Sequence, residues 1–359
     1  MSKLSKRKAA AISRVLFFLV LAQVFASCEV EFSPNAEWKE IPVVYCVLDQ
    51  DDDSSYVRVQ RCFLGSGNQY RFAEVPDSIY YPSDALTVAI EQWNATVASD
   101  GTLHRTGDAP RQVFDFSYEE ILNKQEGRFY NTIQPVYACR TAGLLDSLAV
   151  YRLVVVKNAT GDTIATAETQ LVYGEMQLLK PNNVTYFQFA GTAGSRTCEL
   201  TWRAINAARQ YQPIVRFRYR DFIVNTSVNP PDTTIIPHYI DIPCNTLKSN
   251  MRDPYMTTNL EQNYFLATIR NNIEDVSSNK NIIDTVDIYI NCCNESLAAY
   301  IYAGNPSGSL IQDPFTYTNI NGGIGVFASR RTHIMFKIHT PVSANSNYVK
   351  SLKELGVGF

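Results

Sequence analysis

IPVVYCVL (residues 41–48) is followed by DQDDDSS (residues 49–55) and then by YVRVQRCF (residues 56–63). Apolar side chains recur at every second position in both outer segments, and this is the period of a β-strand. The stretch between them is polar and rich in turn-forming residues, so the two segments are predicted to form an antiparallel hairpin. We expect an even register, which pairs odd-numbered residues with odd-numbered residues and turns both sets towards the core.

The expected register also places two of the cysteines. Cys46 and Cys62 would share the outward face of the hairpin, and this makes them candidates for a disulfide bond. The chain has eight cysteines, but Cys292 and Cys293 are adjacent and the other spacings fit no zinc pattern. The sequence therefore predicts neither a zinc site nor a disulfide-based scaffold.

The same period of two continues along the chain at 85–93, 150–156 and 163–173. Short strands separated by turn signals are typical of a β-sandwich. We predict an all-β protein with two β-sandwich domains of the immunoglobulin or fibronectin III type, one at 41–175 and one at 176–359.

In the second half, Trp202 is expected to point inwards from a strand. Further strands are predicted at NYFLATI (263–269), TVDIYINC (285–292), GVFASRR (325–331) and THIMFKIH (332–339). One or two short helices near the carboxyl terminus are predicted, at ESLAAYIY (295–302) and NYVKSLKEL (347–355).

The amino terminus has the layout of a secretory signal, with four positive charges in MSKLSKRK and then the apolar run VLFFLVLAQVFA (15–26). That run has about a dozen residues, fewer than the roughly 20 that a membrane-spanning helix needs. The following FASC (25–28) is similar to a bacterial lipobox, although Phe25 stands where leucine is usual. We therefore predict a lipoprotein signal peptide at 1–27, acylation of Cys28 with palmitate, and a flexible tether at 28–40. Cleavage after Ala26 by a general signal peptidase is the alternative.

Three arginines, Arg216, Arg218 and Arg220, alternate with Val215, Phe217 and Tyr219. On a strand they would line one face, where their guanidinium groups could hold the carboxylates or phosphates of a partner. The alternative is the solvent-exposed face of a half-buried strand, and it is the one favoured by the pattern.

Other motifs give weaker signals. DQDDDSS supplies carboxylates for calcium but lacks the glycine and glutamate of an EF-hand loop, so a solvated hairpin tip is the preferred interpretation. His333 and His339 would lie roughly 20 Å apart on one strand, too far to share a metal, and His104 and His238 have no ligand at a fitting spacing. The glycine-rich GGIGVFASRR runs into a strand and not a helix, which predicts a tight turn or bulge.

The sequence offers no sign of catalysis or of a cofactor. It contains no nucleophile elbow and no Cys–His signature, and nothing singles out a carboxylate pair such as Glu119–Glu120. The net charge is −3 and the chain has no blocks of basic residues, so the sequence does not predict nucleic-acid binding. The chain contains 21 tyrosines, which serve either as core strand residues or as platforms for sugars and protein partners.

Four segments together resemble a family of uncharacterised Bacteroidota outer-membrane lipoproteins. They are PVVYCVLDQDDDSSYVRVQRCFLGSGN (42–68), EGRFYNTIQPVYACR (126–140), YRLVVVKNATGDTIATAETQLV (151–172) and FTYTNINGGIGVFASRR (315–331). The resemblance implies a mostly β cell-envelope protein with Cys28 as the lipidated residue. In that family, acids just after the cysteine, here Glu29 and Glu31, accompany display on the outer face of the outer membrane; the periplasmic face is the alternative.

These observations favour a non-enzymatic, lipid-anchored surface module that binds a glycan or an outer-membrane protein. The runner-up is an adhesin or fimbria-like subunit that polymerises by adding strands between neighbours. A hydrolase on a sandwich scaffold is a third class, and it would require carboxylates that converge in space.

Overall fold

A computed structural model describes residues 40–62, 69–99, 101–122, 127, 130, 132–182, 186–192, 195–227, 231–250, 253–273, 280–304, 316–339, 350 and 352. The chain divides into two compact units, and the elements below lie in the larger one, Glu40–Phe63 with Tyr70–Phe359, except that α2 begins one residue before it. Within the described ranges, no helix is long and apolar enough to cross a membrane.

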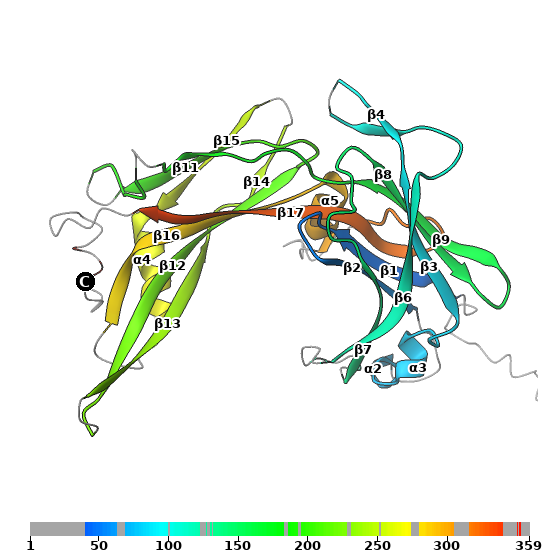
Figure 1. Ribbon diagram of the computed structural model, residues 1–359, viewed down its shortest axis with the longest axis horizontal. Coiled ribbons are helices and arrows are strands. Elements are labelled where there is room, and N and C mark those ends of the chain that lie inside the picture. Colours follow the sequence, from blue (N-terminus) through cyan, green and yellow to red (C-terminus); the bar gives the residue numbers. More distant parts are fainter. Residues whose placement is uncertain are drawn as a thin grey trace, which may run out of the picture. The chain divides into compact units, whose positions relative to one another are not determined.

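The protein is mostly β, as predicted (Figure 1). The first group of strands is β1 (Pro42–Leu48), β2 (Ser54–Arg61), β3 (Leu86–Trp93), β4 (Ala95–Val97), β5 (Leu103–Arg105), β6 (Gln112–Leu122), β7 (Ile133–Arg140), β8 (Val150–Lys157) and β9 (Asp162–Gln170). The second group is β10 (Leu178–Lys180), β11 (Thr197–Arg203), β12 (Gln210–Asn225), β13 (Asp232–Pro243), β14 (Leu247–Lys248), β15 (Tyr255–Glu261), β16 (Lys280–Cys293) and β17 (Ile324–His339). The helices are α2 (Gln69–Ala73), α3 (Pro76–Ile79), α4 (Gln262–Asn272) and α5 (Glu295–Gly304).

One continuous path of hydrogen-bonded strands runs in the order β13-β12-β16-β17-β1-β2-β7-β6-β3-β8-β9, with β14 also paired to β12. Smaller sheets are formed by β10-β11-β15 and by β4-β5. Pairing along the main path is antiparallel except between β1 and β17, which run parallel. The first strand therefore pairs with the last strand of the described chain.

The strand β17 links two hydrophobic cores. Its first half, Ile324 to Ser329, pairs with β1, and its second half pairs with β16 (Figure 1). Phe327 packs into the core to which β1, β2, β3 and β6 to β9 contribute, whereas Met335 packs against the core that contains Trp202. Trp202 is fully buried, as predicted. The predicted domain boundary between residues 175 and 176 stays a prediction.

The glycine-rich segment before β17 serves close packing, in agreement with its interpretation as a turn. Gly322 has a φ of 83° and Gly325 a φ of 121°, a region that favours glycine. A Cβ atom at Gly325 would overlap the carbonyl oxygen of Val44 on β1. Glycine is therefore required where the parallel pair forms.

The hairpin of β1 and β2 is confirmed, but its expected register is wrong. Val44 pairs with Val59 and Cys46 with Val57, so even-numbered residues of β1 meet odd-numbered residues of β2. The even face of β1 is buried, whereas Tyr45 lies on the other face under the Arg58 guanidinium, 4.4 Å from the ring centroid. Because β1 is apolar on both faces, its own pattern could not decide which face turns inwards.

The predicted strand NYFLATI is also wrong, since these residues lie in helix α4. Phe265 and Ile269, four residues apart, are both fully buried, whereas Tyr264 is 44% exposed. A spacing of four places two side chains on one helical face. Seven residues were too few to separate this period from the period of a strand.

The other predicted elements of the second half have mixed outcomes. The segment 295–302 is helical in α5, residues 285–292 lie in β16, and 325–339 form the single strand β17. The predicted carboxyl-terminal helix falls mostly outside the described residues. Helices α2 and α3, near the amino terminus, were not predicted.

Candidate functional site

Arg216, Arg218 and Arg220, which we call the arginine stripe, lie on the outward face of β12. The other face of this strand carries Val215, Phe217 and Tyr219, which are in the core. Arg216 forms two hydrogen bonds to Asp241 of β13, at 2.7 and 2.8 Å. Its guanidinium also lies between the rings of Tyr239 and Tyr289, 4.0 and 4.4 Å from their centroids. The pKa of Arg216 is raised, mainly by the hydrogen bond to Asp241.

Arg218 forms an ion pair with the buried carboxylate of Asp287 on β16, and Arg220 is exposed. Two of the three guanidinium groups are thus held by carboxylates of neighbouring strands. The other predicted site residue, Cys28, lies outside the described residues.

The acidic stretch between β1 and β2 contacts two arginines of β17. Arg331 donates to Asp51 at 2.9 Å, and Arg330 lies 3.6 Å from Asp49 and 3.4 Å from Asp52. Burial raises the pKa of Asp49. In the described part of the chain, no group of three or more His, Cys, Asp or Glu residues could hold a metal ion.

The candidate disulfide between Cys46 and Cys62 is not formed, because the two residues are not opposite each other. Cys46 is buried and pairs with Val57, whereas the N–H of Cys62 donates to the carbonyl oxygen of Ile41 at the far end of the hairpin. All seven described cysteines are free thiols. Burial raises the pKa of Cys198, Cys244 and Cys292 to about 12, and such thiols are poor nucleophiles.

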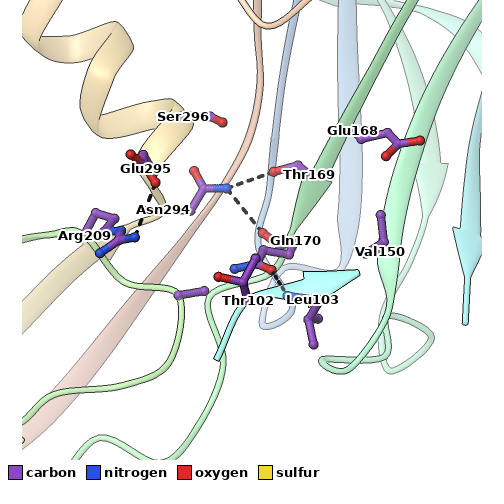
Figure 2. A pocket seen from close by; sticks show the side chains of 11 residues that line it. Thr102, Leu103, Val150, Glu168, Thr169, Gln170, Arg209, Asn294, Glu295 and Ser296 are labelled. Carbon is purple, nitrogen blue, oxygen red and sulfur yellow. Dashed lines mark hydrogen bonds and ion pairs between the residues drawn. The ribbon is translucent and has the colours of Figure 1, made fainter. Parts of the chain in front are cut away.

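A polar pocket of about 270 Å³ lies where β9 ends and α5 begins, and Figure 2 shows the side chains that line it. The Asn294 amide donates to the Thr169 hydroxyl at 2.8 Å and to the Gln170 carbonyl oxygen at 3.3 Å. The Asn294 side-chain oxygen accepts from the N–H of Leu297 at 3.2 Å and so caps α5. These buried groups satisfy one another, so we interpret this network as part of the framework.

A larger pocket, of about 620 Å³, is rich in tyrosine, and we call it the tyrosine pocket. It is lined by Arg61, Pro76, Asp77, Tyr80, Tyr81, Pro82, Ser83, Tyr118, Glu120, Tyr130, Ile133 and Pro135. Its volume falls within the range of roughly 300–1,000 Å³ that is typical of ligand sites.

One wall of the tyrosine pocket continues the inner face of the sheet β2-β7-β6. On β6, Phe114 and Phe116 are in the core, and the next residues on the same face are Tyr118 and Glu120. Tyr118 pairs with Tyr137 of β7, and their rings meet edge to face with centroids 5.9 Å apart. Because side chains alternate between the two faces of a strand, the face of β6 that lies in the core at Phe114 and Phe116 also lines the pocket at Tyr118 and Glu120.

The opposite wall is the segment that contains α3 and the residues after it. Tyr80 and Tyr81 are 5% and 6% exposed, and their burial fixes the ring positions. Arg61, the last residue of β2, donates to the backbone carbonyl oxygen of Asp77 and lies 5.8 Å from the centroid of Tyr81. These contacts hold α3 against the sheet.

The polar groups of the tyrosine pocket include two carboxylates and one guanidinium besides the hydroxyl groups. The Tyr118 hydroxyl donates to a carboxylate oxygen of Glu120 at 3.1 Å, and both Glu120 and Asp77 are exposed. Burial, with the Glu120 hydrogen bond, raises the pKa of Tyr118. The pocket thus combines aromatic surface with two carboxylates and one guanidinium.

Sequence reasoning named Glu119–Glu120 without preferring either residue. Glu120 lines the tyrosine pocket. Glu119 lies on the other face of β6, where it pairs with Val136 of β7. The doublet Tyr80-Tyr81 next to Pro82 was the local signal that was missed, because tyrosines were interpreted individually.

No protein-family model matches this chain, and no curated protein is significantly similar to it. The tyrosine pocket therefore has to be interpreted from its own chemistry. Aromatic rings and a few polar groups around a concave surface are typical of the pockets in which proteins bind small ligands.

Proposed function

We propose that this protein is a non-enzymatic, lipid-anchored cell-envelope module with β-sandwich domains, and that it binds a glycan in the tyrosine pocket. The observation that carries the proposal is the grouping of Tyr80, Tyr81, Tyr118 and Tyr130 around a cavity of about 620 Å³. Placement at the outer membrane, on the cell surface, follows from the signal sequence and the family resemblance described above.

A sugar ring matches this lining chemically. The C–H face of a pyranose is apolar and packs on a flat aromatic ring, while its hydroxyl groups donate to carboxylates at the ring edge. The Tyr118 ring lies beside Glu120, which provides both parts of such a contact. Because the rings are already held by packing, a sugar would bind with little loss of side-chain freedom.

The same carboxylates give little support to glycoside hydrolysis. That reaction needs one carboxylic acid kept protonated by an apolar environment, beside a second that is ionised. Asp77 and Glu120 are both exposed to solvent. We therefore expect bound oligosaccharides to be recovered intact.

Strand β13 lies at one edge of the main sheet, and its prolines favour a binding module over a subunit that polymerises by adding strands. The N–H of Cys244 donates to the carbonyl oxygen of Pro213 on β12. Along an antiparallel pair of strands, residues that bond to the neighbouring strand alternate with residues that do not. In the register of β12 and β13, Pro237 and Pro243 then fall at positions whose backbone faces the free edge. Proline offers no N–H donor to an incoming strand, and this is a common protection of sheet edges.

Removing the Tyr118 ring tests glycan binding. Tyr118→Ala is expected to weaken the affinity for a glycan that binds the wild-type protein about tenfold or more, because one stacking surface is lost. Screening on a glycan array followed by titration calorimetry would measure this. Tyr118→Phe keeps the ring and should stay within about threefold of wild type.

Tyr56→Ala is the matched control for this experiment. Tyr56 is 47% exposed and lies on the other face of the same sheet, where it pairs with Ala138 of β7. Its removal should leave glycan affinity unchanged. Equal losses in Tyr56→Ala and Tyr118→Ala would contradict the proposed site.

Replacing Cys28 tests the membrane anchor. Cys28→Ala should abolish the uptake of labelled palmitate and move the protein from the membrane fraction to the soluble fraction, because two or more acyl chains are needed for firm attachment. Fractionation of cells fed with labelled palmitate measures both effects. Continued labelling of the variant would exclude acylation at Cys28.

A further inference from the structure

We infer that the ligand of the tyrosine pocket is a neutral glycan and that Asp77 and Glu120 exclude acidic glycans. This inference rests on the proposed function and adds the chemical class of the sugar. It starts from the charges that the lining presents: the carboxylates of Asp77 and Glu120 and the guanidinium of Arg61.

The positive charge of Arg61 is already used within the protein. Its guanidinium donates to the Asp77 backbone carbonyl oxygen and lies near the face of Tyr81. The pKa of Glu40, just before β1, is lowered mainly by its hydrogen bond to Lys157 at 2.6 Å, and the charge of Arg61 lowers it further. A ligand carboxylate would therefore have to compete with groups that Arg61 contacts now.

The two carboxylates, in contrast, belong to exposed residues that line the pocket. Asp77 is exposed at the start of α3, and Glu120 is exposed on β6. One oxygen of Glu120 accepts from Tyr118 at 3.1 Å, which orients the carboxylate in the pocket. Carboxylates accept hydrogen bonds and donate none when they are ionised, so they suit hydroxyl groups and repel anions.

An acidic sugar would meet this repulsion at short range. Two unit charges a few ångströms apart near a protein surface interact strongly enough to change affinity about tenfold. A neutral sugar of the same size avoids the repulsion and keeps the stacking and the donated hydrogen bonds. The lining thus separates neutral from acidic glycans by charge.

The test compares neutral and acidic glycans on the full protein. Neutral hexasaccharides of glucose, mannose and galactose and the matching hexauronates are immobilised on one array, and the binding of each is then quantified by titration. We expect at least one neutral hexasaccharide to bind, about tenfold or more tighter than its hexauronate. Raising the salt concentration should narrow this difference, since it screens charge.

The double variant Asp77→Asn/Glu120→Gln isolates the role of the carboxylates. It should bind neutral sugars within about threefold of wild type and gain about tenfold in affinity for the hexauronate. Glu74→Gln/Glu119→Gln is the matched control, since both residues are exposed but neither lines the pocket. The control should keep wild-type selectivity.

The outcomes separate the inference from the proposed function. A preference for hexauronates, or a double variant with unchanged selectivity, would overturn the inference and leave glycan binding in place. If no neutral or acidic glycan binds the wild-type protein, both the proposed function and the inference are wrong.

Discussion

Replacing Gly325 with alanine is expected to lower the free energy of unfolding by about 4 kcal/mol or more. Gly325 has a φ of 121°, where a residue with a Cβ atom is strained. The new Cβ would also overlap the carbonyl oxygen of Val44, so β17 would have to move away from β1. Urea denaturation followed by circular dichroism would measure the loss.

Gly304→Ala is the control for this prediction. Gly304 ends α5, and a Cβ atom there would meet nothing within 4 Å. The free energy of unfolding of Gly304→Ala should stay within about 0.5 kcal/mol of the wild-type value. Wild-type stability of Gly325→Ala would show that β1 and β17 do not form the parallel pair in solution.

Ser329→Val is expected to cost about 2–3 kcal/mol of unfolding free energy. Ser329 is fully buried; its hydroxyl donates to the Gln170 carbonyl oxygen at 2.8 Å and accepts from the N–H of Val172 at 3.0 Å. Valine suits a strand but places a second γ atom at a fully buried position, so overpacking contributes part of the cost. The rest of the cost comes from the Val172 N–H, which would be left buried without its acceptor.

The same substitution at an exposed strand position provides the comparison. Ser117 on β6 is exposed, and Ser117→Val should change stability by no more than about 0.5 kcal/mol. Thermal and urea unfolding of both variants would separate the hydrogen-bond loss from strand propensity. Equal effects at the two positions would contradict a network role for Ser329.

The tyrosine pocket could not be predicted as a site because its residues are far apart in the sequence. Arg61 ends β2, Asp77 is the second residue of α3, and Tyr118 and Glu120 lie on β6. Each alone resembles an ordinary strand or turn residue. Only the pairing of β2 with β7 and of β7 with β6 gives these strands a common face under α3.

The arginine stripe shows the reverse situation. Alternation along β12 was enough to predict that Arg216, Arg218 and Arg220 share the face opposite Phe217 and Tyr219. Their carboxylate partners, however, come from β13 and β16. Local period gives the direction of a side chain, whereas its partner depends on which strands become neighbours.

Local patterns were enough to predict the β class, the first hairpin, the inward Trp202 and the helix α5, because each depends on local period or on turn and capping residues. The inward face of β1, the helical state of α4 and the parallel pairing of β1 with β17 depend instead on contacts between distant segments. In each of these cases the local pattern is compatible with two arrangements. The choice depends on which one buries more apolar surface against segments distant in the chain.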